Sequence, residues 1–281
     1  MPGLSKSLTK GHLILALTER RPPPRKVAKE HKRVREVYDR TAERFVGVYE
    51  RQAYPTILDY IARGYTDDAL LQSLAVSLMT DWPAERLAAL DDFTKVFLSN
   101  LLYGYNYGAQ IQYRAIGGKG KFELKNLAEL ERLERRAVSM SRYAVVRTLE
   151  RKLFMWTTSG VLAGYKPSEV PMNYGYLVDV SHKVGILGGY NEGRSRVVKK
   201  SWKGGEMQKT WAHAGADLKR RDSHVAVEGM TIGLEELFPV ANGVKYPHDW
   251  ENAGCDEWCN CHCYVEYVPG RNATVEPWNG E

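Results

Sequence analysis

The sequence predicts an α+β protein: an elongated N-terminal helical bundle followed by a small mixed α/β C-terminal domain with short strands. Two observations predict this order. Over residues 27–156, apolar side chains recur at steps of three and four, as on one face of a helix. After residue 190 the apolar runs are short and rich in β-branched and aromatic residues, as in small strands. A chain of 281 residues that is 43% hydrophobic can bury the core of one or two domains.

The predicted helical domain, residues 27–156, contains four helical segments. The first covers residues 27–52, the second covers 67–79, the third begins at Pro83, and the fourth covers about 123–156. The first segment shows the pattern most clearly, with one face formed by Val34, Val37, Thr41, Phe45 and Val48. Four long segments of this kind predict a bundle.

The remaining boundaries come from turn-forming residues and from composition. Between residues 157 and 190, glycine and proline interrupt every long periodicity, so this segment is predicted to be a connector with short elements. Residues 191–267 form the predicted C-terminal domain. Residues 1–26, which contain the sequence RRPPPRK, are predicted to be a flexible basic arm, and residues 268–281 a flexible tail.

The charge is distributed unevenly along the chain. Residues 1–221 carry 38 basic and 23 acidic side chains, a balance of +15, whereas residues 222–281 carry 2 basic and 11 acidic ones, a balance of −9. A basic front of this kind favours contact with DNA, without sequence preference, or with an acidic protein surface. The alternative is that these charges only solvate long helix faces. The candidate contact residues are Arg20, Arg21, Arg25, Lys26, Arg194, Arg196, Lys199, Lys200 and Lys203.

The early sequence offers no membrane-spanning or secretory segment. The longest early apolar run, Leu13 to Leu17, is too short for the core of a signal peptide and far too short to cross a bilayer. We therefore expect the protein to be made in a reducing cytoplasm and to have no membrane partner. In that compartment, clustered cysteines are expected to be thiols or metal ligands rather than structural disulfides.

All four cysteines lie in one short segment with the spacing C-x₃-C-x-C-x-C, and four of the seven histidines lie near them in the C-terminal quarter. Thiolates and imidazoles form tetrahedral zinc sites, and His224, His213 or His262 would complete one. Two alternatives stay open: reduced thiols that fill the core, and a disulfide formed after release from the cell. The candidate metal or thiol cluster consists of Cys255, Cys259, Cys261, Cys263 and His224.

A second chemical feature is the sequence Arg221-Asp222-Ser223-His224. A histidine beside several carboxylates acts either as a general base or metal ligand, or as a structural residue that locks a loop through hydrogen bonds. The chain contains no phosphate-binding loop, no GxSxG, no HExxH and no glycine-rich dinucleotide motif. We therefore predict no catalytic residues and expect a protein that is not an enzyme. The alternative is a metal-dependent hydrolase or nuclease that uses His224, Asp222 and the cysteines.

The C-terminal motif residues follow one another in a recognisable order. They are Trp211, Asp217, Arg221, Ser223, His224, Glu228, Gly229, Phe238, Pro247, Asp249, Asn260, Cys261 and Cys263. This series, over roughly residues 190–267, resembles the C-terminal domain of the phage Mu protein F-like head morphogenesis family, the minor head proteins of tailed phages. The chain departs from the family pattern at His262, which stands in place of arginine, at the extra thiols of Cys255 and Cys259, and at His248 inside the proline-aspartate loop.

The resemblance implies a low-copy minor capsid protein of the virion. Such a protein lies in the head interior near the portal and aids procapsid assembly, DNA packaging or DNA ejection. Its partners would be the portal protein, the capsid or scaffold, and genomic DNA bound without sequence preference, and it would be made in the bacterial cytoplasm. A structural zinc ion is the one cofactor that the residues suggest. A DNA-binding protein outside the virion is a further alternative.

Overall fold

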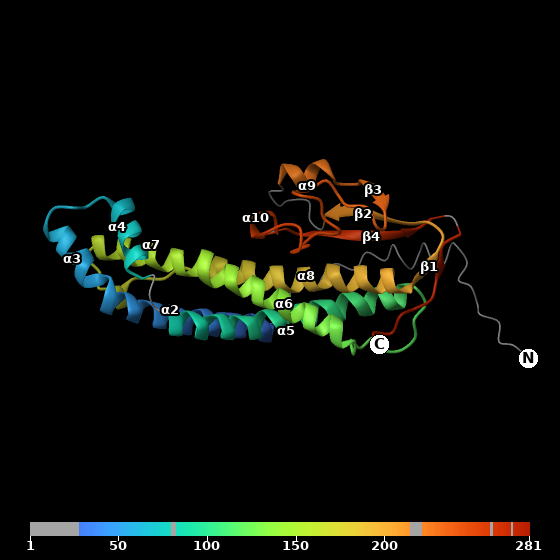
Figure 1. The fold of residues 1–281 in the computed structure, drawn as a ribbon, viewed down its shortest axis with the longest axis horizontal. Helices are drawn as coiled ribbons and strands as arrows, with labels where there is room; N and C mark the ends of the chain where they lie inside the picture. The colour runs from blue at the N-terminus through green and yellow to red at the C-terminus, as the bar shows by residue number, and fades with distance from the viewer. Residues whose placement is uncertain (1–27, 80–82, 214–220, 259–260, 271) are drawn as a thin grey trace, which may run out of the picture. The chain divides into compact units, whose positions relative to one another are not determined.

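The computed structural model describes residues 28–79, 83–213, 221–258, 261–270 and 272–281. The predicted arm, residues 1–26, lies outside the described residues. Helices come first along the chain and antiparallel strands follow, so the predicted α+β class is confirmed (Figure 1). The chain forms two compact units, one made of Val27–Leu98 with Glu134–His182, and the other containing Ser99–Leu133 and Lys183–Glu281. Among the described residues, no helix is long and apolar enough to cross a membrane.

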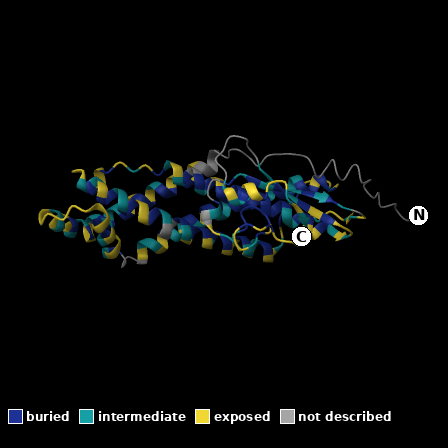
Figure 2. Ribbon diagram, turned by 90° about the horizontal axis from the view of Figure 1, so that it is seen from above, coloured by how far each residue is buried: buried dark blue, intermediate teal, exposed yellow. Residues whose placement is uncertain are grey.

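The helices have the following bounds. They are α2 (Ala28–Gln52), α3 (Tyr54–Ala62), α4 (Asp68–Leu78), α5 (Pro83–Ala115), α6 (Leu127–Arg142), the π-helix η1 (Tyr143–Glu150), α7 (Arg151–Leu162), the 3₁₀ turn η2 (Pro167–Glu169) and α8 (Gly175–Ser201). The four predicted segments correspond to α2, to α4, to α5 and to the run from α6 to α7. Figure 2 shows buried and exposed residues alternating along these helices, as expected of amphipathic elements.

The periodicity places the side chains correctly in α2. Its predicted face, from Val34 to Val48, is buried, and within the same unit the Tyr38 ring lies 4.8 Å from that of Phe93 in an edge-to-face arrangement. The helix α4 begins where the sequence indicates, because the Asp67 side chain accepts a hydrogen bond from the Leu70 N–H at 2.7 Å.

The prediction of a connector over residues 157–190 is wrong for most of that segment. The helix α7 continues to Leu162, and α8 begins at Gly175 and runs without interruption past residue 190. The predicted domain boundary at residue 191 therefore falls inside a helix. Glycine has a low helix propensity, but in α8 it permits close contact with a neighbouring helix.

Glycines at four-residue spacing bring α5 and α8 together. A Cβ atom on Gly104 would lie 2.1 Å from the Ile186 carbonyl oxygen, and one on Gly108 would lie 2.2 Å from that of Tyr190. The contact is reciprocal, since Gly189 and Gly193 approach the carbonyl oxygens of Leu101 and Tyr105 equally closely. These pairings increase together along both helices, so the two segments run in the same direction. Only glycine permits so close an approach of two helix backbones.

The C-terminal strands form two small antiparallel sheets. One has the order β3-β2-β4, with β2 spanning Met207–His213, β3 Thr231–Gly233 and β4 Cys263–Pro269; the other pairs β1 (Trp202–Gly204) with β5 (Thr274–Val275). In β4, buried and half-buried residues alternate, as expected of a strand with one covered face. Two short helices, α9 (Asp222–Ala226) and α10 (Cys255–Trp258), lie in the connections between strands.

The prediction of a flexible tail over residues 268–281 is also wrong. Within this unit β5 pairs with β1, the Trp278 N–H donates to Ser201 Oγ at 2.9 Å, and the Gly280 carbonyl accepts from the N–H groups of Lys125 and Asn126. The polar composition suggested a solvated segment. The tail is held instead by backbone hydrogen bonds, which composition does not encode.

Candidate metal centre

Three of the five predicted ligand residues meet in the C-terminal unit. The backbone pairing of β2 with β4 sets His213 opposite Cys263, so Cys263 opens β4 at the edge of the buried sheet face. His224 lies on α9, whose first turn is closed by the Arg221 carbonyl, which accepts from the N–H groups of His224 and Val225. Cys261 lies in the connection just before β4. Short local elements thus bring three donors from two separate segments to one place.

The geometry of these donors suits a metal ion. His224 Nδ1 lies 3.6 Å from Cys263 Sγ, and the nitrogen and the two sulfurs all lie within 4.8 Å of one another. Two ligands of a tetrahedral zinc ion, with bonds of 2.0 to 2.3 Å, lie about 3.5 Å apart. The three side chains are 4%, 3% and 2% exposed for His224, Cys261 and Cys263. The cluster is therefore able to hold a metal ion away from solvent.

The two thiols differ in acidity. The hydrogen bond from Cys261, assisted by His224, lowers the pKa of Cys263, whereas burial raises the pKa of Cys261. These shifts favour the thiolate at Cys263, beside the imidazole, and the Cys263 N–H donates to Cys261 Sγ at 3.4 Å. The thiolate is the form of cysteine that binds metals. Both thiols are free in the structure, so neither is part of a disulfide.

Glu257 lies on the other side of the histidine ring. His224 Nε2 is 2.8 Å from Glu257 Oε1, and the Ser223 hydroxyl donates to the same oxygen at 2.6 Å. The ring N–H is not aligned for a directed hydrogen bond to this carboxylate. A carboxylate beside the outer nitrogen favours a proton there and leaves Nδ1 as the metal-binding atom. Glu257 is not among the motif residues, although its position beside the cysteine segment is a signal.

Aromatic rings enclose the cluster. The Trp211 ring lies 5.4 Å from that of His224 and 5.1 Å from that of Phe238, and the Trp258 ring lies 5.8 Å from His224 and 5.6 Å from His248. Trp211, Phe238 and Trp258 are at most 1% exposed. These rings exclude water from the side of the histidine, which favours a closed site.

Other motif residues shape the surrounding loops. The Asp249 carboxylate accepts from the Lys245 N–H at 2.9 Å and from the Asn252 side chain at 2.8 Å, so it holds the proline-aspartate loop together. Gly229 adopts a positive φ of 77° and donates its N–H to the Trp211 carbonyl at 2.9 Å. Both residues therefore have structural roles beside the cluster.

Several predicted residues do not join the cluster. His213 and His262 are half-buried and are not among the three clustered donors. The side chains of Cys255 and Cys259, together with Asp217 and Asn260, lie outside the described residues, as do Arg20, Arg21, Arg25 and Lys26.

The basic residues between Arg194 and Lys203 are only partly turned towards solvent. Arg194 is 3% exposed and donates to the Gln112 side chain at 3.2 Å, so its prediction as a contact with DNA or a partner is wrong. Arg196 pairs with the buried Glu129, Lys199 with Glu235 at 2.6 Å, and Lys203 with Glu276 at 3.7 Å. Of this group, Lys200 is exposed and makes no ion pair with any described residue. Helical periodicity turns Arg194 inward, which a linear count of charges does not show.

The arrangement supports two kinds of chemistry. Cys263, His224 and Glu257 are arranged like a nucleophile, its base and an orienting carboxylate. A nucleophile must reach its substrate, however, and Cys263 is only 2% exposed, which disfavours this role. A buried set of two sulfurs and one nitrogen instead suits a metal that holds chain segments together.

Comparison with known proteins identifies no relative: no family model, no curated protein and no solved structure matches this chain.

Proposed function

We propose that this chain is a minor head morphogenesis protein of a tailed phage, present in few copies in the head interior near the portal. The observation that carries the proposal is the convergence of the motif residues. Trp211, His224, Phe238 and Cys263 come from separate segments, and their side chains contact one another in one buried cluster. A motif whose members build a domain core fits a structural module better than a catalytic one.

The same proposal includes a structural zinc ion at His224, Cys261 and Cys263. Two cysteine sulfurs and one imidazole are donors that zinc prefers, whereas magnesium and calcium prefer oxygen, and a zinc ion would displace the proton of Cys261 as it binds. Zinc takes four ligands in structural sites, so one further donor completes this one. The small C-terminal sheets bury a limited core, and a metal staple would add to their stability.

Burial disfavours the alternative of a metal-dependent hydrolase or nuclease. A hydrolytic zinc ion keeps an open position for water and substrate and favours histidine and carboxylate ligands. All three donors here are less than 5% exposed, and two of them are sulfurs. In the proposed role the partners are the portal protein, the capsid or scaffold and, through the basic front, genomic DNA.

The test is mass spectrometry of purified procapsids and virions from infected cells. We expect peptides of this chain in one or both particles, at a few copies relative to the major capsid protein, and enriched when the portal is isolated. The portal protein, measured in the same samples, serves as the internal reference for copy number. Absence from both particles despite normal expression would exclude the proposal and favour a DNA-binding protein outside the virion.

A further inference from the structure

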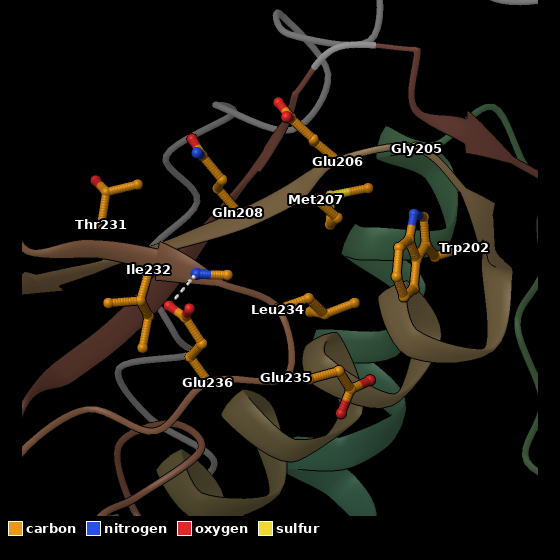
Figure 3. Close-up of a pocket in the computed structure, with 11 residues that line it drawn as sticks. Trp202, Gly205, Glu206, Met207, Gln208, Thr231, Ile232, Leu234, Glu235 and Glu236 are labelled. Atoms are coloured by element: carbon orange, nitrogen blue, oxygen red, sulfur yellow. Dashed lines mark hydrogen bonds between the residues drawn. The ribbon is translucent and has the colours of Figure 1, made fainter.

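An open groove of ≈ 660 Å³ lies between β1, β2 and the turn that follows β3 (Figure 3). The buried side chains of Met207 and Leu234 form its floor, and the half-buried side chains of Trp202 and Ile232 supply the apolar surface that a ligand reaches. The Trp202 indole N–H donates to the Gly204 carbonyl at 2.8 Å. The polar atom of this ring is thus satisfied within the chain, and the face of the ring is available to a ligand.

Carboxylates surround this apolar surface. Figure 3 shows Glu206 and Glu235 on opposite sides of the apolar side chains, with Glu236 beside them. All three are exposed, and among the described residues no lysine, arginine or histidine lines the groove. Glu235 also contacts Lys199 at 2.6 Å, but both side chains are about half exposed, at 58% and 50%, and such a pair exchanges readily with another cation. The groove therefore favours a ligand that is both apolar and positively charged.

The edge of β3 restricts how a ligand binds. The Gly233 N–H donates to Glu236 Oε2 at 2.8 Å, and the Glu236 N–H donates to the Gly233 carbonyl at 3.1 Å. Both backbone groups at this end of the strand are already used, so the addition of a further β-strand is disfavoured here. Recognition must come from side chains that fill the apolar surface and pair with the carboxylates.

We propose that this groove binds the basic N-terminal segment of the same chain, residues 13–26. The segment lies outside the described residues, and its sequence combines the apolar run Leu13–Leu17 with four basic residues between Arg20 and Lys26. The apolar run matches the surface of Trp202 and Ile232, and the basic residues match the three glutamates. An arginine against the Trp202 ring would add a cation–π contact.

The experiment is limited trypsin digestion of the full chain, with intact mass measured at early times. Trypsin cuts after arginine and lysine, so the initial rates of cleavage after Arg20 and Lys26 report whether these side chains are occupied. We expect the double variant Glu206→Lys with Glu235→Lys to be cut about fivefold faster than the parent at low salt, because two exposed ion pairs are lost. The matched control, Glu123→Lys with Glu276→Lys, changes the net charge equally outside the groove and should leave the rate unchanged.

Salt provides a second, independent measurement. Raising the ionic strength should accelerate cleavage of the parent chain towards the rate of the groove variant, after normalisation to a free peptide of residues 11–27. Equal rates for the parent and the groove variant at low salt would overturn the proposal. Protection that grows with protein concentration would overturn it too, because the groove would then bind a second copy. Circular dichroism of both variants confirms that they are folded.

Discussion

Cys261 and Cys263 illustrate how two neighbouring residues of one type differ in chemistry. Cys263 begins a strand beside His224 and has a lowered pKa, whereas burial raises the pKa of Cys261. We expect Cys263→Ser to reduce bound zinc from about one ion per chain to nearly none, and to lower the unfolding temperature of the C-terminal strands. Metal analysis of protein purified without chelators, combined with hydrogen exchange of β2 and β4, measures both effects.

Hydrogen exchange in α2 and α7 serves as the internal control for this variant, because these helices belong to the other compact unit. If the parent contains no zinc and the variant is still destabilised, the thiols stabilise the C-terminal strands without a metal. A serine variant as stable as the parent would rule out a structural role for the cluster.

Glu257 contributes indirectly, by its contact with His224. Replacing it with alanine should weaken zinc binding by about 10- to 100-fold, because the histidine loses the carboxylate beside its outer nitrogen. Glu257→Gln keeps the acceptor for the Ser223 hydroxyl, so this variant should lose less zinc affinity than the alanine variant. Competition with a chromophoric chelator gives the affinities, and Glu228→Gln, at an exposed position nearby, is the control. Equal affinity in the alanine variant and the parent would show that Glu257 does not tune the site.

Lys209 is a buried cation in the centre of β2. It is 2% exposed, its Nζ donates to the Lys245 carbonyl at 2.9 Å, and burial lowers its pKa from 10.5 to about 8. Below pH 8 the folded chain buries a charge at a cost. Between about pH 8 and 10.5 the unfolded chain holds a proton that the folded chain has released, so this residue makes stability rise with pH.

Lys209→Met removes the buried charge and therefore tests its cost to stability. At pH 7 the variant should be more stable than the parent by up to ~3 kcal/mol, less whatever the unpaired Lys245 carbonyl costs. The difference should shrink as pH rises from 8 to 10.5. Urea unfolding of both proteins across this range measures it, and other titrating groups cancel in the comparison. A difference that does not depend on pH would contradict the assignment to the lysine charge.

At the scale of elements, the pairing of α5 with α8 depends on glycine. Gly108→Ala would place a methyl group 2.2 Å from the Tyr190 carbonyl oxygen, so the helices must separate, at a cost of roughly 1–3 kcal/mol. Gly47→Ala in α2 is the matched control, because its nearest neighbour is the flexible end of Arg51 at 3.5 Å. The control should be stabilised by up to ~1 kcal/mol through helix propensity. Thermal unfolding compares the two, and equal effects would show that the close approach is unimportant.

The same elements show what the sequence is able to predict. The period of apolar residues identified α2, with the correct face buried, because periodicity records which side of a helix faces the core. It did not identify α8, since Gly189 and Gly193 look like helix breakers until the neighbouring backbone is known. The pairing of β5 with β1 is long-range and leaves no local pattern. At the site, His224, Cys261 and Cys263 were predicted, but their contact with Glu257 depends on how α9 and α10 are placed by the fold.

For the whole molecule, the distribution of charge is the feature that bears on partners. The first 221 residues carry a balance of +15, but Arg194 is buried and Arg196 pairs with the buried Glu129. The basic residues of the N-terminal segment and the exposed Lys199, Lys200 and Lys203 are therefore the candidates that remain for contact with DNA. If the acidic groove binds the same segment, DNA and the groove compete for it, and the groove weakens DNA binding until a polyanion displaces it.

This competition gives a prediction for the full chain. We expect weak binding to DNA of any sequence, with a slope of log affinity against log salt steeper than about −3, because the segment carries four clustered basic residues. Glu206→Lys with Glu235→Lys should raise the affinity more than Glu123→Lys with Glu276→Lys, although both add the same charge. Only the variant with Glu206→Lys and Glu235→Lys removes the attraction of the groove for the N-terminal segment, so only this variant releases the segment to bind DNA. Fluorescence anisotropy with a labelled duplex, measured over a range of salt concentrations, provides both comparisons. Equal increases in DNA affinity for the two double variants would show that the groove does not affect DNA binding. No binding by the parent even at low salt would assign the basic front to a protein partner.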